Sequence, residues 1–179
     1  MNDTELLTQT EHISDIFTRI MLKIMTEDLA GDEITPAQFQ SLRHIAQHGH
    51  CTIGSIAEGL SVSQPAATML VDRLAKRELV DRQTGRYDRR QAEVSLTPHA
   101  VELIAQLEAD RTERLGRILE LMTSQERGRF VESLERFVAA ALKLETVDEA
   151  CLKCGVEHRE GCIVNKTHLE LAGRQIEKT

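Results

Sequence analysis

Two short apolar segments joined by a very short turn constrain the fold of this chain more than any other feature of its sequence. Thr52 can cap a helix at the first segment and Ser63 can cap a helix at the second, and only Gly59 to Val62 separates them. The apolar residues at helical spacing are Ile53, Ile56, Ala57 and Leu60 in the first segment and Ala67, Leu70, Val71 and Leu74 in the second. Two short helices joined by a turn of three or four residues predict a helix-turn-helix unit.

Four longer helices are predicted on either side of this unit. Apolar residues three and four positions apart indicate a helix over about Leu6–Leu29. Cap residues at Thr35, Thr97 and Thr123 mark the starts of three more, the first two followed by proline. These three helices are expected to span about Pro36–Gln47, Pro98–Met122 and Ser124–Leu144. Aromatic residues make up only 3% of the chain, which favours packed helices with an aliphatic core.

A β-hairpin is predicted between the helix-turn-helix unit and the helix that starts at Pro98. Leu79–Arg82 and Glu93–Leu96 alternate apolar and polar residues or carry β-branched ones, and the polar loop Gln83–Arg90 between them contains a glycine. The fold class expected from this order is mainly α: a winged helix-turn-helix whose wing is this hairpin.

Basic charge is concentrated in one segment of an acidic chain. Residues 73–90 contain seven basic and three acidic residues, a net charge of +4, which leaves −11 on the rest of a chain whose total is −7. Phosphate contacts supply most of the non-specific affinity of a protein for DNA, and the acidic remainder opposes it. This distribution favours DNA binding with restrained non-specific affinity, although a solvated charged face that binds nothing is the alternative interpretation.

The expected DNA contacts lie on the second short helix and on the hairpin. Gln64 can read an adenine edge through two hydrogen bonds, and Thr68 can meet a thymine methyl group or a base edge. An arginine on the hairpin suits a narrow minor groove, where the negative potential is concentrated. The predicted DNA-binding residues are Ser63, Gln64, Pro65, Thr68, Arg73, Lys76, Arg86, Arg89 and Arg90.

From about Ile13 to Leu144 the sequence resembles the MarR family of bacterial winged helix-turn-helix regulators. The strongest stretch, Leu70–Val80, is similar to the end of the family's recognition helix and its entry into the wing. Asp88-Arg89-Arg90 resembles the wing signature, and Val94–Thr97 resembles the strand and helix cap that follow it. Family members usually have a glycine where this chain has Glu78, at the point where the chain leaves the helix.

The resemblance implies a homodimer in which N- and C-terminal helices interlock and Asp88 lies near Arg90. It divides the chain into a regulator domain over residues 1–145 and a tail over 146–179. In the first, residues 35–97 would bind DNA, and helices over 6–29 and 98–145 would form the dimer interface. The function expected is a transcription regulator, a repressor, that binds a palindromic site in double-stranded DNA and responds to a small molecule, an oxidant or a metal.

The tail contains three cysteines and a histidine in a compact pattern. Cys151, Cys154, His158 and Cys162 could form a tetrahedral set that suits Zn²⁺, with His168 as another candidate for the fourth ligand. An iron–sulfur cluster, redox chemistry at the Cys151 and Cys154 pair, or an exposed tail without a role are the alternatives. The tail has too little apolar content to be expected to order itself, and metal binding could supply that free energy.

Other features restrict the remaining possibilities. Cys51 is expected to be a buried small apolar residue, and His44 and His48 are expected to be structural or solvated rather than metal ligands. No motif of an enzyme is recognisable, so no catalytic residue is predicted. The chain has no apolar run of about 20 residues and begins with polar ones, from which we expect a cytoplasmic protein without a membrane partner. The functional alternative is a metal-binding structural or protein-interaction module without sequence-specific DNA binding.

Overall fold

A computed structural model describes residues 2–27, 34–84, 92–144 and 162–172. The predicted wing residues Arg86, Arg89 and Arg90 lie outside the described residues. The predicted metal ligands Cys151, Cys154 and His158 lie outside them as well.

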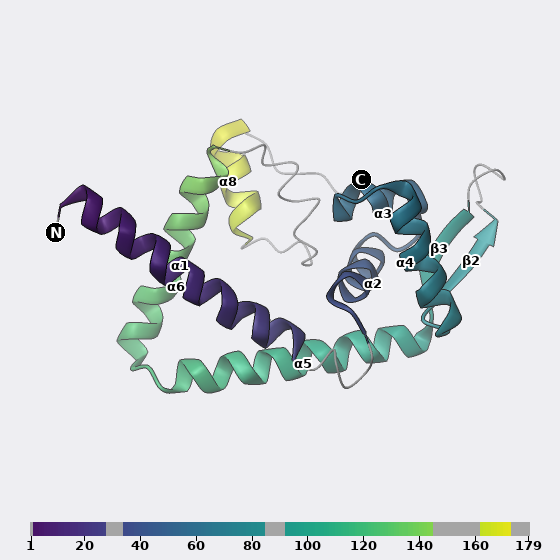
Figure 1. Cartoon of the computed structure of the whole chain (residues 1–179), viewed down its shortest axis with the longest axis horizontal. Coiled ribbons are helices and arrows are strands. Elements are labelled where there is room, and N and C mark those ends of the chain that lie inside the picture. Colours follow the sequence, from purple (N-terminus) through teal and green to yellow (C-terminus); the bar gives the residue numbers. More distant parts are fainter. Residues whose placement is uncertain (1, 28–33, 85–91, 145–161, 173–179) are drawn as a thin grey trace.

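Helices dominate the described residues, as the sequence predicted, and Figure 1 shows their arrangement. The helices are α1 (Asp3–Thr26), α2 (Pro36–His48), α3 (Ile53–Leu60), α4 (Gln64–Lys76), α5 (Pro98–Glu120), α6 (Ser124–Leu142) and α8 (Ile163–Ala172). Each predicted cap residue is the N-cap of its helix, and Thr35, Thr52 and Thr123 each form a full capping box. Cap side chains bind backbone N–H groups that the first helical turn leaves unpaired, which is why these boundaries could be predicted closely.

A three-stranded antiparallel sheet accompanies the helices. Its strands are β1 (Cys51–Thr52), β2 (Val80–Thr84) and β3 (Ala92–Leu96), in the order β1-β3-β2. The predicted hairpin is the β2–β3 pair, in which Val80 lies opposite Leu96 and Arg82 opposite Val94. The sequence did not predict β1, because two residues are too few for an alternating pattern to be visible.

The hydrophobic core lies between α2, α3, α4, the sheet and the first half of α5. Leu42, Ile45, Ile56, Leu74 and Val94 are fully buried there. Burial of each such side chain stabilises the fold by about 1.5–3 kcal/mol. The core therefore fixes the helix-turn-helix unit and the base of the hairpin as one body.

The long helices extend away from this body. In Figure 1, α5 runs along one edge of the molecule to α6, and α1 lies across them. The ring centroids of Phe17 on α1 and Phe130 on α6 are 6.2 Å apart, and the Arg114 guanidinium on α5 lies 3.2 Å from the Glu27 carboxylate at the end of α1. Among the described helices, none has the length and apolar character needed to cross a membrane.

The tail contains a helix that the sequence analysis did not predict. Helix α8 packs against α6 and buries Val164 and Thr167. The expectation that the tail does not order itself is thus corrected for residues 163–172. Its apolar residues are few, and three of its buried residues are polar (Asn165, Thr167 and His168), so the pattern of an amphipathic helix is weak.

Candidate nucleic-acid interface

The turn between α3 and α4 is held by backbone hydrogen bonds. Ser61 adopts a left-handed conformation, with φ of 54°. The N–H of Val62 donates to the carbonyl of Ala57 at 3.0 Å, which closes the end of α3. The Ser63 hydroxyl then accepts from the N–H of Ala66 at 3.4 Å and starts α4. These contacts fix the angle at which α4 leaves the core.

Helix α4 has a buried face and an exposed face. Ala67, Val71 and Leu74 are fully buried, at helical spacing, against the core. All six predicted DNA-binding residues that the structure describes are exposed: Ser63, Gln64, Pro65, Thr68, Arg73 and Lys76. Met69, which was not among the predicted contacts, is also exposed on α4 and could contact thymine methyl groups. Its exposure beside buried Ala67 and Val71 could not be inferred from an apolar side chain alone.

The side chains at the start of α4 are already arranged by neighbouring groups. The Thr68 hydroxyl donates to the carbonyl of Gln64 at 2.9 Å, so its oxygen can still accept a hydrogen bond from a base. The Gln64 amide nitrogen lies 3.6 Å from the position that a Cβ on Gly54 would occupy. Gln64 therefore lies close to the first turn of α3.

Glu78, where the resemblance led us to expect a glycine, adopts a strained backbone conformation. Glu78 has φ of +56°, in the left-handed region that favours glycine. Its N–H donates to the carbonyl of Ala75, and the N–H of Leu79 donates to the carbonyl of Leu74, both at 3.0 Å. Leu74 and Leu79 are both buried, as the apolar contact of this type of helix end requires. The chain thus closes α4 with a non-glycine residue in a conformation that suits glycine better.

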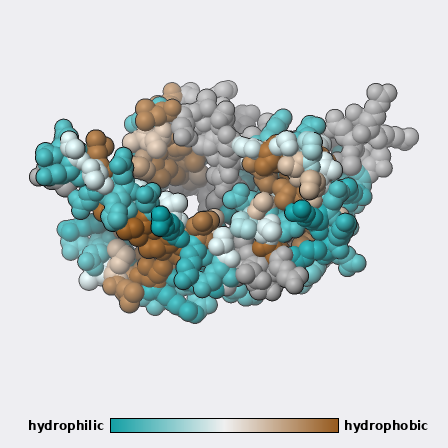
Figure 2. All heavy atoms as spheres, in the orientation of Figure 1, coloured by the Kyte–Doolittle hydropathy of each residue, from teal (hydrophilic) through white to brown (hydrophobic). Residues whose placement is uncertain are grey.

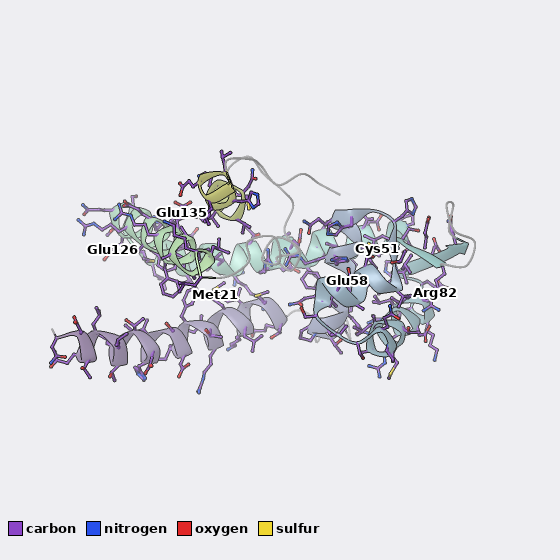
Figure 3. All side chains as sticks on the ribbon, turned by 90° about the horizontal axis from the view of Figure 1, so that it is seen from above. Met21, Cys51, Glu58, Arg82, Glu126 and Glu135 are labelled. Atoms are coloured by element: carbon purple, nitrogen blue, oxygen red, sulfur yellow. The ribbon has the colours of Figure 1, made fainter. Side chains whose placement is uncertain are left out.

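The base of the hairpin is joined to α4 by an ion pair. The Arg82 guanidinium on β2 donates a hydrogen bond to the Asp72 carboxylate on α4. Figure 3 labels Arg82 at the end of the molecule where the hairpin lies. In the sequence, Arg82 is recognisable only as part of the basic segment, and nothing there points to a role for Asp72.

A second exposed surface is apolar and lies at the other end of the molecule. Of the 24 residues of α1, only Ile24 is buried. Ile13, Ile16 and Ile20 on α1 are 46–55% exposed, and Val131 and Phe137 on α6 are 49% and 62% exposed. We call these five residues the α1–α6 apolar surface. Figure 2 shows apolar side chains gathered over these helices.

The described part of the tail holds two of the candidate metal ligands. Cys162 is half-buried just before α8, and His168 is buried on that helix. Among the described residues, no group of three or more potential ligands could hold a metal ion. The predicted site therefore remains a prediction, since its other residues lie outside the described ranges.

Cys51 is buried, as we expected, and His44 on α2 is buried as well. Cys51 is 2% exposed, and burial raises the pKa of its thiol to about 11. His44 is 4% exposed, and burial together with the neighbouring His48 lowers its pKa to about 4. The thiol and the imidazole are therefore both neutral at pH 7.

Comparison with known proteins agrees with this geometry. A model of the MarR family matches residues 34–92. The HTH-type transcriptional regulator YsmB of Bacillus subtilis is 32% identical over 130 residues, which cover 69% of this chain and 89% of that protein. The HTH-type transcriptional repressor MdtR of the same species is 31% identical and covers 57% of this chain and 66% of its own length. The crystal structure of RV1404 from Mycobacterium tuberculosis superposes with a TM-score of 0.69 at 27% identity, covering 78% of this chain and 95% of that one.

Proposed function

This chain belongs to the MarR family of transcription regulators, and we propose that it is a repressor that binds a palindromic operator as a homodimer. The observation that carries the proposal is the exposed face of α4, which presents polar and basic side chains beside a hairpin that packs on the same hydrophobic core. Members of this family are transcription regulators and not enzymes, in agreement with the sequence-based expectation.

Helix α4 would enter the major groove with its first turn against the bases. Gln64 and Thr68, in the first two turns, are exposed and can make directed hydrogen bonds to base edges. Arg73 and Lys76 follow on the exposed side of the same helix, where phosphates would be within reach of their long side chains. This division makes the start of α4 responsible for sequence preference and its end responsible for affinity.

The hairpin would lie over the adjacent minor groove. Strands β2 and β3 lead into residues 85–91, whose sequence contains Arg86, Arg89 and Arg90. We propose these three arginines as the wing contacts, because arginine is attracted by the negative potential of a narrow minor groove.

The α1–α6 apolar surface supports the homodimer. Large contiguous apolar patches are unusual on monomeric soluble proteins and mark interaction sites. A second copy would cover Ile13, Ile16 and Ile20, which the α1 of one chain leaves exposed. In such a dimer we expect the two α4 helices to lie about one turn of DNA, roughly 34 Å, apart.

The direction of regulation and the signal are further parts of the proposal. The similarity to MdtR, which is named as a repressor, supports repression. We further propose that the tail holds zinc through Cys151, Cys154, Cys162 and His158, with an iron–sulfur cluster as the alternative, because three thiols and an imidazole suit either group. A metal centre in the tail could act either as a clasp or as a sensor that changes the dimer.

The experiment that tests the dimer is sedimentation of the protein alone and with an operator selected from random duplexes. Two chains per protein particle and two chains per duplex are expected at micromolar concentration. A monomer under these conditions, or one chain per operator, would contradict the proposal.

A further inference from the structure

The ion pair between Asp72 and Arg82 joins the two elements that the proposed function brings to DNA. Asp72 is on α4, between the buried residues Val71 and Leu74, and Arg82 is on β2. An acidic side chain on a helix that meets phosphates would be repelled by them. The presence of Asp72 therefore calls for a role other than direct contact with DNA.

The strand geometry places Arg82 on the side of the hairpin that faces the helices. Side chains alternate between the two faces of a strand, so Arg82 shares a face with Val80, which is buried in the core. Arg82 lies opposite Val94 on β3, which is fully buried. The next pair towards the tip of the hairpin, Gln83 and Glu93, is not buried. The ion pair thus links α4 to the hairpin where the hairpin leaves the core.

Stability of the fold is a poor explanation for this ion pair. The Arg82 and Asp72 side chains are 37% and 48% exposed. Exposed ion pairs contribute little to stability, because water solvates both charges well and ordering two side chains costs entropy. The orientation of one element relative to the other is a property that such a pair can set even when its net contribution to stability is small.

We propose that Asp72 and Arg82 are positioning residues that set the direction of the wing relative to α4. The inference rests on the proposed function, since it assigns the ion pair to the geometry of DNA binding. With its guanidinium bound to Asp72, Arg82 is not one of the phosphate contacts, although it belongs to the basic segment. Loss of either partner leaves the wing free to take several directions, and operator binding then costs additional ordering.

Replacement of Asp72 separates positioning from simple electrostatics, because the two predict opposite signs. Asp72→Asn removes a negative charge near DNA, so electrostatics alone predicts tighter operator binding. Positioning predicts that operator binding becomes weaker by about tenfold. A change of this size lies within the coupling energies found for residues in contact. Asp81→Asn is the matched control: Asp81 is the exposed neighbour of Arg82 on the opposite face of β2, and its replacement changes the charge equally. We expect binding by this control to be unchanged or slightly tighter.

The test measures operator affinity at several salt concentrations for the unchanged protein, Asp72→Asn, Arg82→Gln, the double variant and Asp81→Asn. We expect both single variants to bind about tenfold more weakly and the double variant to bind no more weakly than either. Arg82→Gln should leave the salt slope unchanged, whereas loss of a phosphate contact would lower it by about one unit. Hydroxyl-radical footprints of the bound single variants should lose the minor-groove protection beside the site. Methylation footprints with dimethyl sulfate should keep the protection of guanines in the major groove.

The outcomes distinguish this inference from the proposed function. If the unchanged protein binds no operator, both are overturned. If the unchanged protein binds the operator, two results would overturn only the positioning role. The first is operator binding by Asp72→Asn that is as tight as, or tighter than, that of the unchanged protein. The second is a double variant whose loss of affinity is the sum of the two single losses. Unfolding curves give the folded fraction of each variant at the assay temperature. If the loss of affinity is no larger than the loss of folded protein, the positioning role is also overturned.

Discussion

The imidazole of His44 on α2 packs directly against Gly59 on α3, so that a Cβ at position 59 would lie 2.2 Å from its Cε1 atom. Helices α2 and α3 approach closely at this point, and both residues are buried. The absence of a side chain at Gly59 is what lets the first helix of the helix-turn-helix unit lie against α2.

Gly59→Ala is therefore expected to destabilise the protein by about 1–3 kcal/mol, because the added methyl group must displace a buried ring. Denaturant unfolding monitored by circular dichroism measures the change. Gly54→Ala on the same helix is the control: its Cβ would have its nearest contacts at 3.6 Å, an ordinary van der Waals distance. We expect this control to be about 0.5 kcal/mol more stable than the unchanged protein, since alanine favours helix. Equal stability of the two variants would show that the approach at Gly59 is not tight.

The buried state of His44 predicts a specific pH dependence of stability. Its pKa is lowered to about 4 in the folded chain, mainly by burial, from 6.5 in the unfolded chain. The unfolded state thus binds more protons between these values, and stability contributed by neutral His44 is lost as the pH falls from about 6.5 to 4. The loss should be on the order of 3 kcal/mol. His44→Gln should show a smaller fall than the unchanged protein in denaturant unfolding at pH 7 and pH 4.5, and an equal fall in both would contradict the assignment.

Glu78 marks a position where the chain can be stabilised. Its left-handed conformation costs a residue with a side chain about 1 kcal/mol, a cost that glycine does not have. Glu78→Gly should accordingly raise the free energy of unfolding by up to about 1 kcal/mol. Glu58→Gly, at an exposed position inside α3, should lower it by about the same amount. Thermal unfolding of the two variants checks the opposite signs, and destabilisation by Glu78→Gly would argue against a strained turn.

The proposed metal centre of the tail is tested by its cysteines. A variant with Cys151, Cys154 and Cys162 all changed to serine should lose one zinc ion, or one iron–sulfur cluster, per chain. Elemental analysis and an absorption spectrum of protein purified without oxygen provide the measurement. Unchanged metal content would eliminate the site. Lost metal with unchanged operator affinity and unchanged response to effectors would leave only a structural clasp.

The local elements of this fold were predictable because side chains near in sequence specify them. The caps Thr35, Thr97 and Thr123 and the spacing of Val71 and Leu74 act within one or two turns of helix, so their effects are visible in the sequence. The features that depend on residues distant in sequence were not visible. Strand β1 exists because Cys51 pairs with Val94, and α8 is held by packing on α6.

The candidate site shows the same limit. The exposed residues of α4 could be identified, since the helical period separates them from its buried face. The ion pair between Asp72 and Arg82 could not, because it depends on the angle between a helix and a strand. The need for a glycine at position 59 likewise could not be predicted, because it depends on how closely α2 packs against α3.

The ratio of affinities for a selected operator and for a scrambled duplex, at one physiological salt concentration, tests the central claim most directly. We predict a ratio of about 10³ or more, as specific DNA-binding proteins show. Gln64→Ala should reduce it by about tenfold, through loss of a base contact worth roughly 1–3 kcal/mol. A ratio near one for the unchanged protein would contradict the account, because the exposed face of α4 would then carry no sequence recognition.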